Sequence, residues 1–269
     1  MRAYFLRNLR LLTVDAVRDA LRRRILFAVL LVCFFAVFAL DQCTAFWNGS
    51  IIAQGQRVPL EHFGRAAALP IFSILSLALT LLAALLASDE LTRPLESGAA
   101  NLILARPVGR ASYVLARLLG PLVVTWVIAV LLFGIGTALF AQRQNAPPLP
   151  GLFTALACAG CTAVAAALAM ILALWLSRFG TIALGAAALC PILYANAAAL
   201  IGFELKGSWA LVNKLAPPFL SSVVLAVAPW VPDIPIYGNP QMVAAQLIAW
   251  VVGSVLCLII VFRRTELPH

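Results

Sequence analysis

The sequence contains few charged residues for its length. Asp, Glu, Lys and Arg make up 11% of the 269 residues, whereas hydrophobic residues make up 64%, and the mean hydropathy is +1.02. A soluble globular protein of this size needs far more polar side chains to cover its surface. The scarcity of charge therefore excludes a soluble domain and indicates a membrane protein.

Motifs for nucleotide and catalytic chemistry are also absent. The sequence has no GxxxxGKS or GxxxxGKT phosphate-binding loop, and its only lysines are Lys206 and Lys214. It has no HExxH or GxSxG motif, and no apolar run carries a central charge of the kind that proton relays use. We therefore expect no catalytic residue, no enzyme activity and no cofactor bound by this chain.

Metal ligands are equally few. The two histidines are His62 and His269, and the six cysteines are scattered. Cys158 and Cys161 have the spacing of a metal or redox pair, but no second pair accompanies them and they lie in an apolar run. We favour their interpretation as small residues at a helix contact, and we predict no metal site.

Long apolar runs are what the sequence does contain. Five of them are long enough to cross a hydrocarbon core of about 30 Å as helices, and a shorter run, 25–40, becomes a sixth span if its helix continues past Asp41. The predicted fold class is therefore all-α, a polytopic membrane protein with six transmembrane helices and both termini on one side. The five longer runs are 66–88, 118–141, 152–177, 179–203 and 242–262.

The basic residues are distributed unequally between the two sides. Fourteen of the nineteen lie on the side of the termini, which makes that side cytoplasmic. The formal charge of +9 is thus mainly a topology signal, with membrane lipids as contacts. Nucleic acid is not an expected partner, because the arginines cluster at span ends. The five basic residues on the outer side are Arg57, Arg65, Arg143, Lys206 and Lys214.

The N-terminal segment, 1–24, is amphipathic at helical spacing. Its arginines lie opposite an apolar stripe, and it leads directly into the first span, so a helix on the cytoplasmic membrane surface is favoured over a free cytosolic helix. The transmembrane domain then occupies 25–262, and 263–269 form a cytoplasmic tail. The apolar stripe consists of Phe5, Leu9, Leu12, Ala16 and Ala20.

The outer region 204–240 is rich in proline, and its apolar part, 219–228, is too short to span. Counting that part as a span would place Arg263 and Arg264 outside, against the charge distribution. We expect short re-entrant helices in the outer leaflet. The residues expected at the level of the lipid headgroups are Trp209, Trp230 and Tyr237.

The predicted fifth span contains Pro191, which predicts a kink, and two polar residues, Tyr194 and Asn196. These two are candidates for a transport path. Ordinary packing between helices is the favoured alternative, and it requires that the Asn196 amide finds a hydrogen-bonding partner.

A polar segment, 89–112, separates the second span from the third on the cytoplasmic side. Pro94 fits the first turn of a helix and Pro107 ends it, which predicts a helix of about a dozen residues that lies along the membrane surface. Asp89 and Glu90 are expected to mark the end of the preceding span rather than to form a buried acid pair.

A specific pattern runs through this segment and just beyond it: Glu96-Ser97-Gly98, Leu102, Leu104, Pro107-Val108-Gly109-Arg110, Tyr113, Arg117 and Gly120. It resembles the permease subunits of ATP-binding-cassette (ABC) transporters of the type-2 class. Two departures are Arg117, where the family commonly has lysine, and Ala99, where threonine is frequent. With the surface helix, the six spans and the outer re-entrant helices, the resemblance covers nearly the whole chain.

The resemblance implies that the short helix is a coupling helix, seated in a groove of a separate cytosolic ATPase that binds ATP and Mg²⁺. It also implies export through a pathway between two permease chains, a homodimer or a pair of related paralogues, in the inner membrane of a bacterium. The residues expected to dock the ATPase are Glu96, Gly98, Leu102, Ile103, Arg106, Pro107 and Arg110.

Two other functional classes stay open at this point. One is an ATPase-independent carrier or channel, which the lack of charged residues inside the spans disfavours. The other is a membrane scaffold that assembles other proteins. The sequence selects no particular substrate, although the apolar interior favours an amphipathic or lipid-like cargo.

Overall fold

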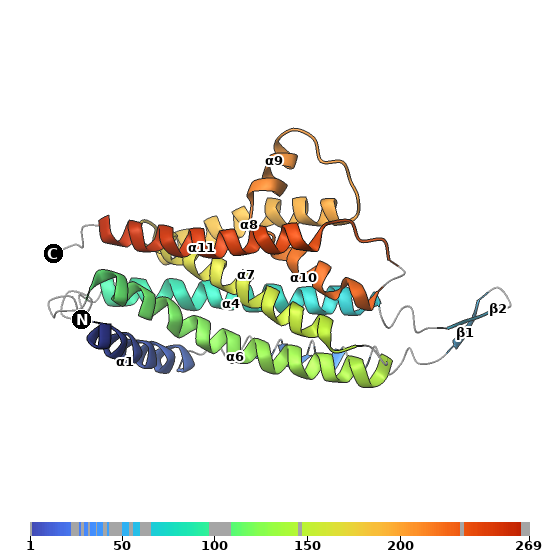
Figure 1. Cartoon of the computed structure of the whole chain (residues 1–269), viewed down its shortest axis with the longest axis horizontal. Coiled ribbons are helices and arrows are strands. Elements are labelled where there is room, and N and C mark those ends of the chain that lie inside the picture. The colour runs from blue at the N-terminus through green and yellow to red at the C-terminus, as the bar shows by residue number, and fades with distance from the viewer. Residues whose placement is uncertain are drawn as a thin grey trace.

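The chain forms a bundle of long helices packed along one another (Figure 1). The computed structural model describes residues 2–22, 50–53, 56–59, 66–96, 109–144, 147–231 and 234–264, with short runs between 27 and 42. The elements, in chain order, are α1 (Arg2–Leu21), β1 (Ser50–Ala53), β2 (Gln56–Pro59), α4 (Ala68–Glu96), α6 (Arg110–Gln144), α7 (Leu149–Ala173), α8 (Arg178–Leu200), α9 (Ser208–Leu215), α10 (Phe219–Val227), η1 (Ala228–Trp230) and α11 (Pro240–Arg264).

Among the described residues, five helices are long and apolar enough to cross a membrane, namely α4, α6, α7, α8 and α11. They confirm the five longer runs predicted as spans. Helix α9 meets the unit formed by α10 and η1 at an angle of 69°, which fits either one broken span or a re-entrant loop. Most of the predicted first span lies outside the described residues, so the count of six stays a prediction. Helix α1 and the C-terminal end of α11 lie at the same end of the bundle (Figure 1).

One short hairpin interrupts the helical architecture. Strands β1 and β2 pair antiparallel, with Ile51 opposite Val58 and Ile52 opposite Arg57, at the end of the bundle far from α1 (Figure 1). The predicted all-α fold class is confirmed for the described residues, and this short hairpin is a local addition to it. The β-branched residues Ile51, Ile52 and Val58 favour extended backbone, yet each strand has only four residues, which is too short for a clear alternating pattern.

The helix that precedes the polar segment is longer than predicted. Helix α4 continues to Glu96 with Pro94 in its last turn, so Pro94 ends this helix instead of starting a new one. Asp89 and Glu90 are buried, with exposed fractions of 5% and 1%, and the prediction that they mark the solvated end of the span is wrong. The Glu90 carboxylate pairs with Arg117 inside the bundle, whereas Asp89 pairs with the exposed Arg93 one turn further along α4.

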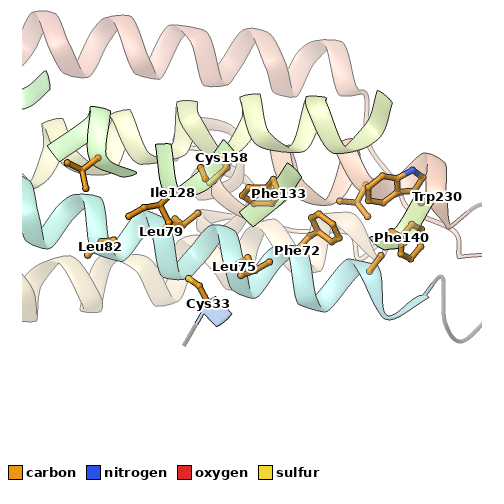
Figure 2. Close-up of a cluster of buried hydrophobic side chains, with 14 of the residues drawn as sticks. Cys33, Phe72, Leu75, Leu79, Leu82, Ile128, Phe133, Phe140, Cys158 and Trp230 are labelled. Atoms are coloured by element: carbon orange, nitrogen blue, oxygen red, sulfur yellow. The ribbon is translucent and has the colours of Figure 1, made fainter. Parts of the chain in front are cut away.

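A buried apolar cluster joins α4 and α6 to the C-terminal end of α10 (Figure 2). The Phe72 ring lies 5.6 Å from the Phe133 ring and 5.3 Å from the Trp230 ring, and the Trp230 ring lies 4.7 Å from the Phe140 ring, measured between centroids. Trp230 is only 2% exposed, so its ring packs inside the bundle, and its predicted depth at the level of the lipid headgroups stays a prediction. The other two residues predicted there, Trp209 and Tyr237, are 41% and 57% exposed.

The described part of α1 packs on α6 through small residues. Ala16 and Ala20, both from the predicted apolar stripe, are fully buried, and α1 makes most of its helix contacts with α6. A Cβ atom built on Gly120 would lie 2.5 Å from the Ala16 Cβ and 3.0 Å from its carbonyl carbon. Glycine at position 120 therefore sets how closely the two helix backbones approach.

Gly120→Ala is expected to destabilise the protein by about 1 to 3 kcal/mol, because the added methyl group meets the backbone of α1 and forces the helix to move. Thermal unfolding of the purified protein in detergent measures the effect. Gly134→Ala is the matched control, since nothing lies within 4 Å of a Cβ at that position of α6. Equal losses in the two variants would contradict close packing of α1 on α6.

Candidate functional site

A buried ion pair joins α4 to α6 close to residues 97–109, the part of the polar segment that connects these two helices. The Arg117 Nη1 atom on α6 lies 3.0 Å from the Glu90 Oε2 atom on α4, and the two side chains are 6% and 1% exposed. Both residues lie about two helical turns from residues 97–109, because α4 ends at Glu96 and α6 begins at Arg110. The pair therefore joins the two helices that lead into and out of residues 97–109.

The same arginine contacts a third helix and an aromatic ring. Its Nη1 atom lies 3.7 Å from the Asp19 Oδ2 atom on α1, whose side chain is 51% exposed. Its guanidinium carbon lies 5.6 Å from the centre of the Tyr113 ring, four residues earlier and thus on the same face of α6. Tyr113 in turn stacks on Phe262 of α11, at 6.0 Å between centroids. Four helices meet around Arg117.

The rim of this end of the bundle is basic. Arg110, the first residue of α6, is exposed, and its Nη1 atom donates a hydrogen bond of 3.2 Å to the carbonyl oxygen of Arg263. Arg93 is 62% exposed at its side chain and pairs with Asp89 at 3.6 Å. Exposed charges of this kind set orientation and encounter with a partner more than they add affinity. The exposed arginines of the rim are Arg18, Arg22, Arg93, Arg110, Arg263 and Arg264.

The predicted docking residues are only partly described. Glu96 is the last residue of α4, and Arg110 is the first residue of α6, so these two flank residues 97–109. The helix predicted between them stays a prediction. The docking residues outside the described part of the chain are Gly98, Leu102, Ile103, Arg106 and Pro107.

The two candidate transport-path residues have different surroundings. Asn196 is 1% exposed, and its Oδ1 atom accepts hydrogen bonds from the Ser221 hydroxyl at 2.8 Å and the Ser221 amide at 3.3 Å. These bonds join α8 to the start of α10, as the packing interpretation requires. Tyr194 is 59% exposed and lies edge-on to Trp209, with centroids 4.9 Å apart. The structure therefore does not bring the two residues together on one path.

Asn196 also lines a cavity of about 160 Å³ between α8, α9, α10 and α11. Ligand pockets usually have volumes of about 300 to 1,000 Å³, so this cavity is too small to hold a lipid-sized cargo in the state described. Its lining contains no charged side chain. The lining residues are Asn196, Ala199, Leu200, Asn213, Pro218, Ser221, Leu225, Tyr237, Gly238, Val243 and Gln246.

Two residues of α11 bind the break between α9 and α10, and sequence reasoning missed both. The Gln246 amide donates to the carbonyl oxygens of Ala216 at 2.7 Å and of Lys214 at 3.1 Å, and the Trp250 indole donates to the Leu215 carbonyl at 3.0 Å. Carbonyls at a helix end need such donors wherever lipid excludes water. The signal in the sequence was a pair of donors four residues apart, on one face of an apolar span.

Gln246→Leu keeps the approximate size of the side chain and removes these donors. We expect it to destabilise the packing of α9 by about 0.5 to 1.5 kcal/mol for each lost hydrogen bond, because these groups are partly buried or exposed. Faster hydrogen–deuterium exchange in α9, with unchanged exchange in α7, is the expected readout. Gln241→Leu, at the exposed start of α11, is the control and should change neither helix.

One known protein family matches most of the sequence. No curated protein matches it. The family of ABC-2 family transporter proteins matches residues 15–267, which is nearly the full length and includes α4, α6, the segment between them and the helices that follow. The chain therefore belongs to the ABC-2 transporter family and is a multi-pass membrane component, the permease, of an ABC transporter.

Proposed function

We propose that this permease exports its cargo by using ATP hydrolysed in a separate cytosolic subunit, which docks on residues 97–109. The observation that carries the proposal is the buried ion pair between Glu90 and Arg117. It holds the two flanking helices together, so a force on the segment reaches both spans as a unit. A loop without such a joint would absorb much of the displacement by bending.

The separate subunit supplies the ATP and Mg²⁺ chemistry, since this chain has no phosphate-binding loop. Glu96, Arg106 and Arg110 make the polar rim contacts of the docking surface, and Leu102 or Ile103 packs into the groove of the ATPase. Gly98 and Pro107 complete the set of docking residues. Two permease chains and two ATPases form the working unit, with the cargo pathway between the permeases.

The basic rim faces the cytoplasm of a bacterium, and the opposite end faces outward across the inner membrane. Helices α9 and α10 form a re-entrant loop in the outer leaflet, where Gln246 and Trp250 bind the exposed carbonyls of the break. Helix α1 lies along the inner surface. Its exposed apolar residues Leu11, Val14 and Leu21 contact lipid, while Ala16 contacts α6. The cargo is amphipathic or lipid-like.

Purification of the tagged chain from its native membrane tests the proposal. We expect a cytosolic subunit with a Walker motif and vanadate-sensitive ATP hydrolysis to copurify. Arg110→Glu and Glu96→Arg should insert normally but weaken the association and the hydrolysis that depends on it. Lys206→Glu, which reverses an 86% exposed charge beyond the far end of α8, is the matched control.

The same preparation separates the alternatives. A carrier or channel would move fluorescent lipid or small-molecule probes in vesicles that contain the chain alone, without ATP. A scaffold would recover partner proteins without any ATP-dependent flux. Normal ATP hydrolysis and association in both charge-reversal variants would count against docking at this segment.

A further inference from the structure

Arg117 of α6 forms ion pairs with carboxylates on two other helices. Its Nη1 atom lies 3.0 Å from Glu90 of α4 and 3.7 Å from Asp19 of α1. We propose that Arg117 and Asp19 are positioning residues that transmit displacement of the docking segment to helix α1. This inference rests on the proposed function and adds α1 to the parts that move when the ATPase closes.

The two ion pairs of Arg117 differ in burial, and the difference assigns them different roles. Glu90 is 1% exposed and lies 3.0 Å away, so in low-dielectric surroundings its attraction to Arg117 is strong and persistent. Asp19 is 51% exposed and lies 3.7 Å away, so water screens its attraction to the same atom. Arg117 therefore stays with α4, whereas its contact with α1 can form and break.

The neighbouring turn provides the second contact between α1 and α6. Ala16 precedes Asp19 by three residues, and Gly120 follows Arg117 by three, so both contacts lie on one face of each helix. At Gly120 the two backbones approach closely, and only the small Ala16 methyl group lies at the contact. The contact between Ala16 and Gly120 stays in place. Forming or breaking the ion pair between Asp19 and Arg117, one turn away, then changes the tilt of α1 relative to α6.

Hydrogen–deuterium exchange of the purified permease–ATPase complex in lipid nanodiscs tests this inference. Exchange in peptides of α1 is compared between the nucleotide-free complex and the complex trapped with ATP and vanadate. We expect the exchange rate in α1 to differ at least about twofold between these states in the parent protein. The difference should disappear in Asp19→Asn and persist in Asp15→Asn, which removes an equivalent exposed carboxylate one turn earlier.

Two variants of Arg117 distinguish transmission from a merely structural role. Arg117→Lys keeps the charge and should keep the nucleotide-dependent difference, whereas Arg117→Gln should abolish it. If Arg117→Gln does not fold, Asp19→Asn alone decides, because its side chain is half exposed. A difference that persists in Asp19→Asn would overturn the inference, even if exchange in α1 rises equally in both states, because such a rise reports only lost packing.

The outcomes also separate this inference from the proposed function. If no ATP hydrolysis copurifies with the parent chain, the proposed function fails. If hydrolysis copurifies but exchange in α1 is the same with and without trapped nucleotide, the inference fails and the proposed function stands.

Discussion

Glu90→Gln is expected to destabilise the protein by about 3 to 5 kcal/mol, which is the usual cost of removing one partner from a buried ion pair. The loss arises because the Arg117 guanidinium, 6% exposed, keeps its charge but loses a carboxylate 3.0 Å away. The half-exposed Asp19 carboxylate at 3.7 Å is a weak replacement. The loss of stability is measured as a shorter half-life of the folded protein in detergent at one fixed temperature.

A double replacement distinguishes two free energies: the cost of leaving the Arg117 charge unpaired, and the net stabilisation that the ion pair provides. Glu90→Leu combined with Arg117→Met should recover most of the lost stability, because well-packed apolar residues often replace a buried ion pair at little cost. It should not recover communication with α1, which needs the charge of Arg117. Arg93→Ala is the control, since its pair with Asp89 involves a side chain that is 62% exposed, and exposed pairs contribute about 0 to 1 kcal/mol. A loss in Arg93→Ala as large as in Glu90→Gln would contradict a special role for the buried pair.

The spans were predictable from sequence and their ends were not. A long run of apolar residues has few stable solutions in lipid other than a helix, so the helices α4, α6, α7, α8 and α11 follow from hydropathy alone. The continuation of α4 to Glu96 depends on the pairing of Glu90 with Arg117, which are 27 positions apart. No local sequence pattern predicts a contact between residues so far apart. Two acidic residues followed by a proline resemble the end of a span.

The sequence likewise predicts some features of the candidate site and not others. Asn196 was expected to need a partner inside the bundle, but its partner Ser221 belongs to α10, whose position depends on the turn at Pro217 and Pro218. The paired donors Gln246 and Trp250 were overlooked, because α9 and its exposed carbonyls are visible only in three dimensions. The docking residues implied by the motif resemblance stay a prediction, and of these Glu96 ends α4 and Arg110 begins α6.

Trp230 shows how a general rule for tryptophan can miss a contact inside the bundle. Tryptophan near prolines at the end of an apolar run is typical of the membrane interface, where the indole N–H reaches water. Here the Trp230 indole donates a 2.7 Å hydrogen bond to the carbonyl oxygen of Pro147, in the connection between α6 and α7. A partner 83 positions away satisfies the polar group, so the ring is buried against Phe72 and Phe140.

Trp230→Ala is therefore expected to destabilise the protein by about 3 to 5 kcal/mol, because it leaves a cavity between α4, α6 and α10. Trp230→Phe should lose about 0.5 to 1.5 kcal/mol, the net value of one hydrogen bond, since its ring still fills most of the site. Trp209→Ala, at a side chain that is 41% exposed, is the matched control with a small effect. Similar losses in Trp230→Ala and Trp209→Ala would contradict the buried position.

The location of the damage is as informative as its size. Asn196 holds the first turn of α10 through Ser221, and Trp230 holds the last turn through Pro147. With the second anchor removed, hydrogen–deuterium exchange should rise toward the C-terminal end of α10 and in η1 while the first turn stays protected. A uniform increase in exchange along α10 would mean that loss of the Trp230 contact also frees the first turn. The whole helix would then unfold from the bundle as one unit.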